Sequence, residues 1–279
     1  MRLLGYRKET ERVKKKGLRI LAAAAVLTFG CLTMNAYAAE GWALSNNIWT
    51  YLDKNGNRVT NEWKKGADNL WRYLNNSGEM AVNSWADNDY YVDANGIMVA
   101  DKWMQIVSPY SRDSQTYWFY FGASGKVTKD TWKKIDGKSY YFDSDGIMQT
   151  GWTEDGDYYL SSSGAMVTGW RYLEPKDEDS SLYGTESDDG KYWFYFSASG
   201  KKQSPSTSDD GGEYKVTKID GKYYCFDADG RMRTGWVYLE GDPENSSKSS
   251  IADWRYFAES GIQNATVGAA ISGWLSLNP

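Results

Sequence analysis

Histidine is absent from this 279-residue sequence, and cysteine occurs only at Cys31 and Cys225. Without an imidazole the chain cannot build a Ser-His-Asp or Cys-His catalytic centre or a histidine-based metal site. Cys31 lies in a segment that we expect to be removed, so we predict no intramolecular disulfide. We interpret Cys225 as a packed thiol rather than a reactive one.

Carboxylates are numerous, but they gather in polar stretches such as 177–179 and 188–189. A glycosidase needs two carboxylates held across a rigid cleft, and no segment outside the repeats described below is long enough to form one. The run Asp143–Gly146 lacks the bidentate Glu of a calcium loop. We therefore predict no enzyme activity, no metal site and no cofactor.

The first 38 residues differ from the rest of the chain. Eight basic residues lie over 2–19, an apolar run covers 18–32 apart from Arg19, and the small-residue site Ala36-Tyr37-Ala38 follows. This layout predicts a secretory signal peptide, residues 1–38, cut after Ala38. The alternatives are weaker, because the run is short for a membrane anchor and Cys31 lacks the flanking residues of a lipidation site. We expect residues 39–279 to be secreted to the cell wall or cell surface, with no membrane attachment.

Removing the leader leaves the mature chain acidic. It retains 24 Lys and Arg against 35 Asp and Glu, a net charge of −11. A chain of this charge repels nucleic acid and anionic membranes. Nucleic acid is therefore excluded as a partner.

Aromatic residues make up 16% of the sequence, and all fourteen tryptophans fall in one of two slots of a short motif that recurs nine times. The motif is an aromatic pair, then a Gly four residues on, then a Trp six or seven residues later. Aliphatic residues are too sparse for a conventional two-layer core. A period near twenty residues predicts an array of small stacked units.

Each unit reads as a β-hairpin. Asp-Gly and Asn-Gly pairs such as Asp136-Gly137 separate the strand segments, as is typical of tight turns. Positions two apart share a face, so the Trp that opens the second strand and the second Tyr of the pair lie together, and the intervening residue faces the other way. The stretch 204–212 stands in the place of a Trp-bearing strand. We expect a defective repeat there and a hinge near residues 203–213.

The sequence Met-x-Thr-Gly-Trp occurs at 148–152, 166–170 and 232–236, each close to a Tyr-rich or Phe-bearing strand. This pattern resembles the choline-binding, cell-wall-binding repeats of Gram-positive bacteria and their phages, over 41–274. The resemblance implies an all-β solenoid of about nine stacked hairpins with a left-handed superhelix. It also implies ligand sites between successive hairpins, where two Trp of one hairpin and an aromatic of the next form a cage.

The residues that carry over to such sites are of two kinds. The paired walls are Trp42 with Trp49, Trp63 with Trp71, Trp103 with Trp118, Trp170 with Trp193, and Trp236 with Trp254; the expected third walls are Tyr73, Tyr91, Tyr141 and Tyr224. Trp85, Trp132 and Trp152 face a polar residue in the second slot, and we interpret them as packing residues.

The resemblance implies a non-catalytic protein that recognises choline on teichoic acid or another cell-wall polymer. Two alternatives stay open at this point. The same Trp faces can stack on sugars, which would make the chain a glucan- or carbohydrate-binding array. The aromatics can also be purely structural, in which case the protein is a surface scaffold or adhesin.

Overall fold

The computed structural model describes residues 40–110, 114–176, 189–205, 214–239, 254–260 and 265–271. The predicted signal peptide lies outside these residues, and so does most of the predicted hinge, over 206–213. Both stay predictions. No helix occurs in the described part of the chain, so none there crosses a membrane.

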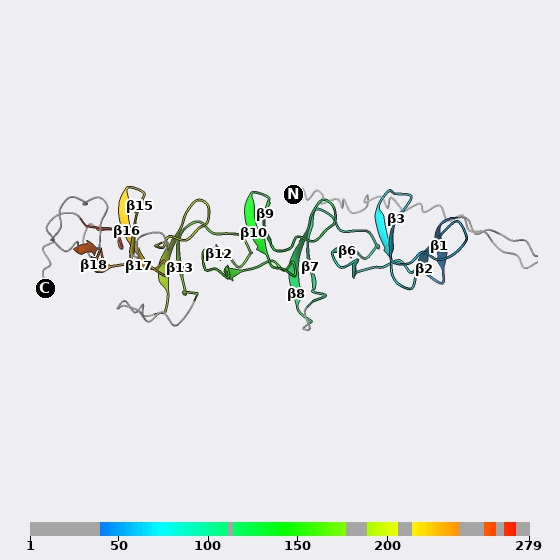
Figure 1. The fold of residues 1–279 in the computed structure, drawn as a ribbon, viewed down its shortest axis with the longest axis horizontal. Coiled ribbons are helices and arrows are strands. Elements are labelled where there is room, and N and C mark those ends of the chain that lie inside the picture. Colours follow the sequence, from blue (N-terminus) through cyan, green and yellow to red (C-terminus); the bar gives the residue numbers. More distant parts are fainter. Residues whose placement is uncertain are drawn as a thin grey trace, which may run out of the picture. The chain divides into compact units, whose positions relative to one another are not determined.

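The described residues form nine small antiparallel sheets, each built on one hairpin (Figure 1). The pairs are β1 (Gly41–Ser45) with β2 (Ile48–Leu52), β3 (Glu62–Lys65) with β4 (Trp71–Leu74), β5 (Ser84–Ala86) with β6 (Tyr90–Val92), β7 (Lys102–Val107) with β8 (Thr116–Phe121), β9 (Thr131–Ile135) with β10 (Lys138–Phe142), β11 (Gly151–Trp152) with β12 (Tyr159–Leu160), β13 (Gly169–Leu173) with β14 (Tyr192–Phe196), β15 (Tyr214–Ile219) with β16 (Lys222–Asp227), and β18 (Gly235–Tyr238) with β19 (Trp254–Phe257). The short strand β17 (Met232–Arg233) adds to β16. The all-β hairpin array is confirmed.

The register of the hairpins follows the aromatic motif. The Trp of the first strand pairs directly with the second Tyr of the aromatic pair, as Trp63 does with Tyr73 and Trp170 with Tyr195. The tight turns take left-handed backbone angles, as at Asp136 and Gly137 with φ of 49° and 80°. These angles match the twist of a two-residue hairpin turn, which explains the Asp-Gly pair.

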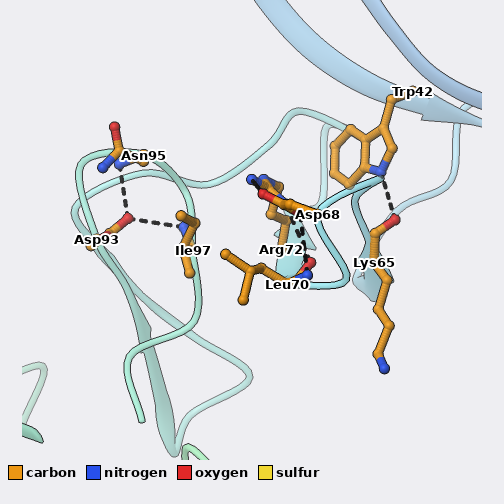
Figure 2. Close-up of polar contacts among 8 residues, drawn as sticks. All are labelled: Trp42, Lys65, Asp68, Leu70, Arg72, Asp93, Asn95 and Ile97. Atoms are coloured by element: carbon orange, nitrogen blue, oxygen red, sulfur yellow. Dashed lines mark hydrogen bonds and ion pairs between the residues drawn. The ribbon is translucent and has the colours of Figure 1, made fainter. Parts of the chain in front are cut away.

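Between hairpins the chain makes a compact turn closed by a side chain. The Asp93 carboxylate accepts hydrogen bonds from the backbone N–H groups of Asn95 and Ile97, at 2.8 and 3.0 Å (Figure 2). The carboxylates of Asp53, Asp143 and Asp227 accept in the same way in their own repeats, and so does the side-chain amide oxygen of Asn75. This arrangement satisfies backbone donors that no strand pairs, so it orients each hairpin relative to the next.

The chain divides into two compact units, the first covering 40–102 with Phe121–Lys126 and the second covering Trp103–Tyr120 with the described residues from Val127 on. Within each unit one backbone hydrogen bond recurs between neighbouring hairpins. The residue two positions after the turn glycine donates to the carbonyl of the strand-opening residue of the preceding hairpin. Examples are Met98 to Trp71 at 2.9 Å, and Met148 to Trp118 and Lys202 to Asp157, both at 2.8 Å.

In eight of the nine described hairpins the side chain at the position after the second residue of the aromatic pair is fully buried. These residues are Leu74, Val92, Phe121, Phe142, Leu160, Phe196, Phe226 and Phe257. A few large apolar side chains thus supply the buried area that a lone hairpin lacks. The tyrosines before them are half-buried or buried at the edge of the same packing.

The repeat that we expected to be defective forms a complete hairpin. Strand β15 pairs with β16 over six residue pairs, and Val216 lies opposite Cys225 where other repeats have Trp opposite Tyr. The expectation of a missing strand is therefore wrong. Val216, at the position of the Trp, is β-branched and therefore favours the strand, but it provides no aromatic ring.

Candidate functional site

Each hairpin has two distinct faces. One face carries the first-strand Trp, the strand-opening residue and the second Tyr, and the other carries the residue between the aromatic slots. The ring contacts show which faces meet: Trp132 contacts Tyr158, Trp152 contacts Phe194 and Trp170 contacts Tyr224, at centroid distances of 5.0, 5.0 and 4.8 Å. The Trp-bearing face of one hairpin therefore packs on the intervening residue of the next.

The first candidate cage lies where β7–β8 meets β9–β10. The rings of Trp103 and Trp118 are 6.3 Å apart and nearly perpendicular, at 84°. Tyr140 of the next hairpin closes on Trp103 at 4.9 Å and 68°. Trp118 is 43% exposed, which a ring confined to a core would not be. The cage walls thus come from two hairpins, and one wall is open to solvent.

The second candidate cage repeats this geometry where β13–β14 meets β15–β16. Trp170 and Trp193 are 6.4 Å apart at 82°, and Tyr224 lies 4.8 Å from Trp170 at 61°. Trp193 is 42% exposed, and its ring also contacts Tyr172 at 5.2 Å. The agreement between the two cages in every distance and angle shows that one local sequence pattern generates both.

A third junction, where β3–β4 meets β5–β6, has the same parts in a different arrangement. Tyr90 closes on Trp63 at 5.4 Å and 67°, and Trp71 is 41% exposed. The ammonium group of Lys65 lies over the Trp71 ring, 4.9 Å from its centroid. One wall of this junction is therefore already in contact with a cation of the chain.

A model of the family described as "Choline-binding repeat" matches residues 39–85 and 127–169. These two stretches of the chain are thus similar to choline-binding repeats. These matches include Trp63 and Trp71 of the third junction and Tyr140 of the first cage. No curated protein matches the chain.

Solved structures of choline-binding proteins resemble the chain as well. The modular autolysin LytC from Streptococcus pneumoniae is 23% identical, with 78% of this chain and 51% of that chain covered and a TM-score of 0.41. Choline-binding protein F of the same organism is 20% identical, with 85% of this chain and 81% of that chain covered and a TM-score of 0.47. The choline-binding domain of CbpL, also from Streptococcus pneumoniae, is 26% identical, with 72% of this chain and 100% of that chain covered and a TM-score of 0.39. The chain thus spans about half the length of LytC.

Three of the expected third walls lie against the Trp of their own hairpin rather than against the paired Trp of the preceding hairpin. Tyr73, Tyr91 and Tyr141 contact the Trp of their own hairpin instead, namely Trp63, Trp85 and Trp132, at 5.1, 5.8 and 5.4 Å. The reason is the alternation of side chains along a strand, which places the second Tyr on the same face as its own Trp. The residue before it, Tyr90 or Tyr140, reaches the preceding hairpin. Tyr224 already occupies that intervening slot.

The two terminal Trp pairs differ from the cages. Trp42 contacts Tyr51 of its own hairpin at 5.5 Å, and its indole N–H donates to the Lys65 carbonyl at 2.9 Å (Figure 2). The slot that should supply a third ring holds Arg72, which pairs with Asp68. At the other end, Trp236 is exposed, and the Trp254 side chain lies outside the described residues.

The tryptophans that lack a strand-opening partner pack against neighbouring rings. Trp152 contacts Tyr159, Phe194 and Phe196 at 5.2, 5.0 and 5.8 Å. Trp85 contacts Tyr91 and also Phe121 at 5.6 Å. Such contacts are those of a solenoid core.

The titratable side chains beside the second cage are buried packing residues that stay protonated. Burial raises the pKa of the Tyr224 phenol and raises that of the Cys225 thiol to about 12, so the thiol stays protonated. Within the described ranges no three Asp, Glu or Cys side chains lie close enough to hold a metal ion. The cages therefore offer apolar ring faces.

Proposed function

We propose that this protein is a secreted, non-catalytic cell-wall-binding protein that recognises the choline groups of teichoic acid through aromatic cages between successive hairpins. The observation that carries the proposal is the repeated cage geometry of Trp103, Trp118 and Tyr140 and of Trp170, Trp193 and Tyr224. The family match to choline-binding repeats supports the ligand.

The chemistry of the ligand fits these walls. A quaternary ammonium has no N–H to donate, so it gains from ring faces rather than from hydrogen-bond acceptors. Two nearly perpendicular indoles and a tyrosine ring can surround its methyl groups on three sides. Each well-placed ring contributes about 0.5 to 2 kcal/mol.

Three rings together give a few kcal/mol, which corresponds to roughly millimolar affinity for one cage. A polymer that carries many choline groups engages both cages at once. The second contact is then intramolecular, and the avidity gain is on the order of a hundredfold or more. The repeat array is therefore suited to retention on a polymer. Because each single cage binds weakly, free choline at high concentration can still displace the protein from that polymer.

The test is retention on a tertiary-amine resin and elution by free choline. The mature chain, from residue 39, is compared with the double variant Trp118→Ala plus Trp193→Ala. Both rings are exposed, so their loss removes a wall of each cage with little loss of packing. We expect the parent to be retained and eluted by choline, and the double variant to pass through.

The matched control is Trp132→Ala, because Trp132 is a similarly exposed indole at a junction whose strand-opening residue is Ser139. This variant should be retained like the parent. Retention of the parent that choline does not reverse would contradict the proposal. So would binding to dextran or starch in place of the resin, which would instead support a carbohydrate-binding array.

A further inference from the structure

The junction between β11–β12 and β13–β14 differs from the two cages at two positions that touch each other. Its strand-opening residue is Asp157 where the cages have Trp118 and Trp193. The residue two positions after its turn glycine is Lys202, where five other repeats have methionine, as at Met148. The backbone N–H of Lys202 donates to the Asp157 carbonyl at 2.8 Å, so the two substituted residues meet directly.

Lys202 takes the place of a methionine in the packing as well as in the sequence. A Cβ placed on Gly164 would lie 2.3 Å from Sδ of Met148, and one placed on Gly230 would lie 2.7 Å from Cδ of Lys202. Both side chains therefore cross the turn glycine of the next repeat. Met148 packs against the same buried cluster as the Trp103 and Tyr140 rings of the first cage. The same route brings the Lys202 side chain toward the aromatic walls of its own junction.

The aromatic walls of this junction are arranged as in a cage. Trp152 and Phe194 lie 5.0 Å apart at 72°, close to the 4.9 Å and 68° of Trp103 and Tyr140. The ammonium group of Lys202 lies 5.3 Å from the centroid of the Trp152 ring. A primary ammonium of the chain thus lies against the ring that would otherwise take a ligand cation.

The surrounding charges suit a cation held in place. Asp157 forms an ion pair with Lys201 at 3.1 Å. Burial of the Lys202 side chain lowers its pKa, Asp229, Asp157 and Asp227 favour its charged form, and Lys176 opposes that form. A second cation entering the junction would face the Lys202 ammonium at short range, where like charges repel strongly.

We propose that Lys202 is the built-in cation of this junction and that it excludes quaternary ammonium ligands from it. The array then includes open cages that take a ligand and this closed junction, which the chain fills itself. This inference rests on the proposed function, since it explains which junctions take the same ligand.

The decisive experiment converts the closed junction into an open one. Calorimetric titration with choline gives the number of sites per chain for the parent, Asp157→Trp, Lys202→Met and the double variant. We expect both single variants to keep the parent's number of sites. Lys202→Met still lacks the second indole wall, and Asp157→Trp still has the Lys202 ammonium. The double variant should gain one site.

The outcomes separate the two proposals. A parent that binds no choline contradicts the proposed function. A parent that binds choline, with Asp157→Trp alone gaining a site, shows that the Lys202 ammonium excludes nothing and overturns this inference. A folded double variant with the parent's number of sites overturns it too.

A measurement on the parent protein does not depend on the variants or on choline binding. The NMR signal of the Lys202 ε-protons should lie upfield of that of Lys201, because the Trp152 ring current shields them, and saturating choline should leave it in place. A Lys202 signal at the position of an exposed lysine, or one that choline displaces, would overturn the inference even if the double variant does not fold.

Discussion

The turn glycines set how closely successive hairpins stack, and Gly164→Ala is the sharpest test of this. Gly164 has a φ of +78°, and an added Cβ would lie 2.3 Å from Sδ and 2.6 Å from Cε of Met148. Alanine in the left-handed region costs about 1 to 2 kcal/mol. Displacing a packed side chain costs about 1 to 3 kcal/mol more. The expected total loss of folding free energy is about 2 to 5 kcal/mol.

The matched control is Gly137→Ala, in the hairpin turn of the same repeat as Met148. Gly137 has nearly the same φ, +80°, but no atom lies within 4 Å of an added Cβ. This variant should lose only the conformational term, about 1 to 2 kcal/mol. Urea unfolding followed by near-ultraviolet circular dichroism gives both losses, and the difference between them measures the contact with Met148 alone.

The same substitution should weaken ligand binding at one cage. Met148 packs against the same buried cluster as Trp103 and Tyr140, so moving it should disturb the cage that these rings form, while the cage of Trp170 and Trp193 should be unaffected. Calorimetry with choline should show one weakened site in Gly164→Ala and none in Gly137→Ala. Equal destabilisation by the two substitutions, or unchanged affinity at both cages, would refute the reasoning.

Three further predictions concern single side chains. Tyr140→Ala should weaken choline binding at its cage about two- to thirtyfold, whereas Tyr141→Ala should not, because only Tyr140 reaches Trp103; equal effects in a calorimetric titration would contradict the assignment. Cys225 is fully buried with its pKa raised to about 12, so a thiol reagent at pH 8 should label it only as fast as β16 opens, and rapid labelling of the folded chain would argue against the packing. The Arg72 guanidinium lowers the pKa of Asp68 from 3.8 to about 2, so this pair stabilises the fold above pH 4 and is lost as the pH falls from 4 to 2; thermal melts of Asp68→Asn should show a loss of up to about 1 kcal/mol at pH 6 that vanishes at pH 2.

The hairpins could be predicted from the sequence because two local signals coincide. Aromatic residues at alternate positions define a strand, and Asp-Gly or Asn-Gly pairs define its ends, as at Asp136 and Gly137. Both signals act within ten residues, so no information about distant contacts is needed. Strand β15 shows the limit of this reasoning, because its Val216 carries the register of the motif without its tryptophan.

The third wall of each cage depends on contacts between repeats. The alternation along β10 shows that Tyr140 and Tyr141 point to opposite sides, but it does not show which side meets the preceding hairpin. The ring contact of Trp103 with Tyr140 decides that question. The place of the Lys202 ammonium depends in the same way on the stacking of two hairpins, since its ring partner Trp152 lies fifty residues earlier in the chain.

The division of each cage between two hairpins couples ligand affinity to the integrity of the stack. A single hairpin, such as β7 with β8, holds only two of the three rings, and the third arrives when β9 and β10 pack on it. On the proposed function we expect choline to bind the stacked state in preference to the separated one, and at ten times its dissociation constant each occupied cage should add about 1.4 kcal/mol to stability. A protein anchored on its polymer would then be harder to unfold, and harder for proteases to cut, than the same chain free in solution.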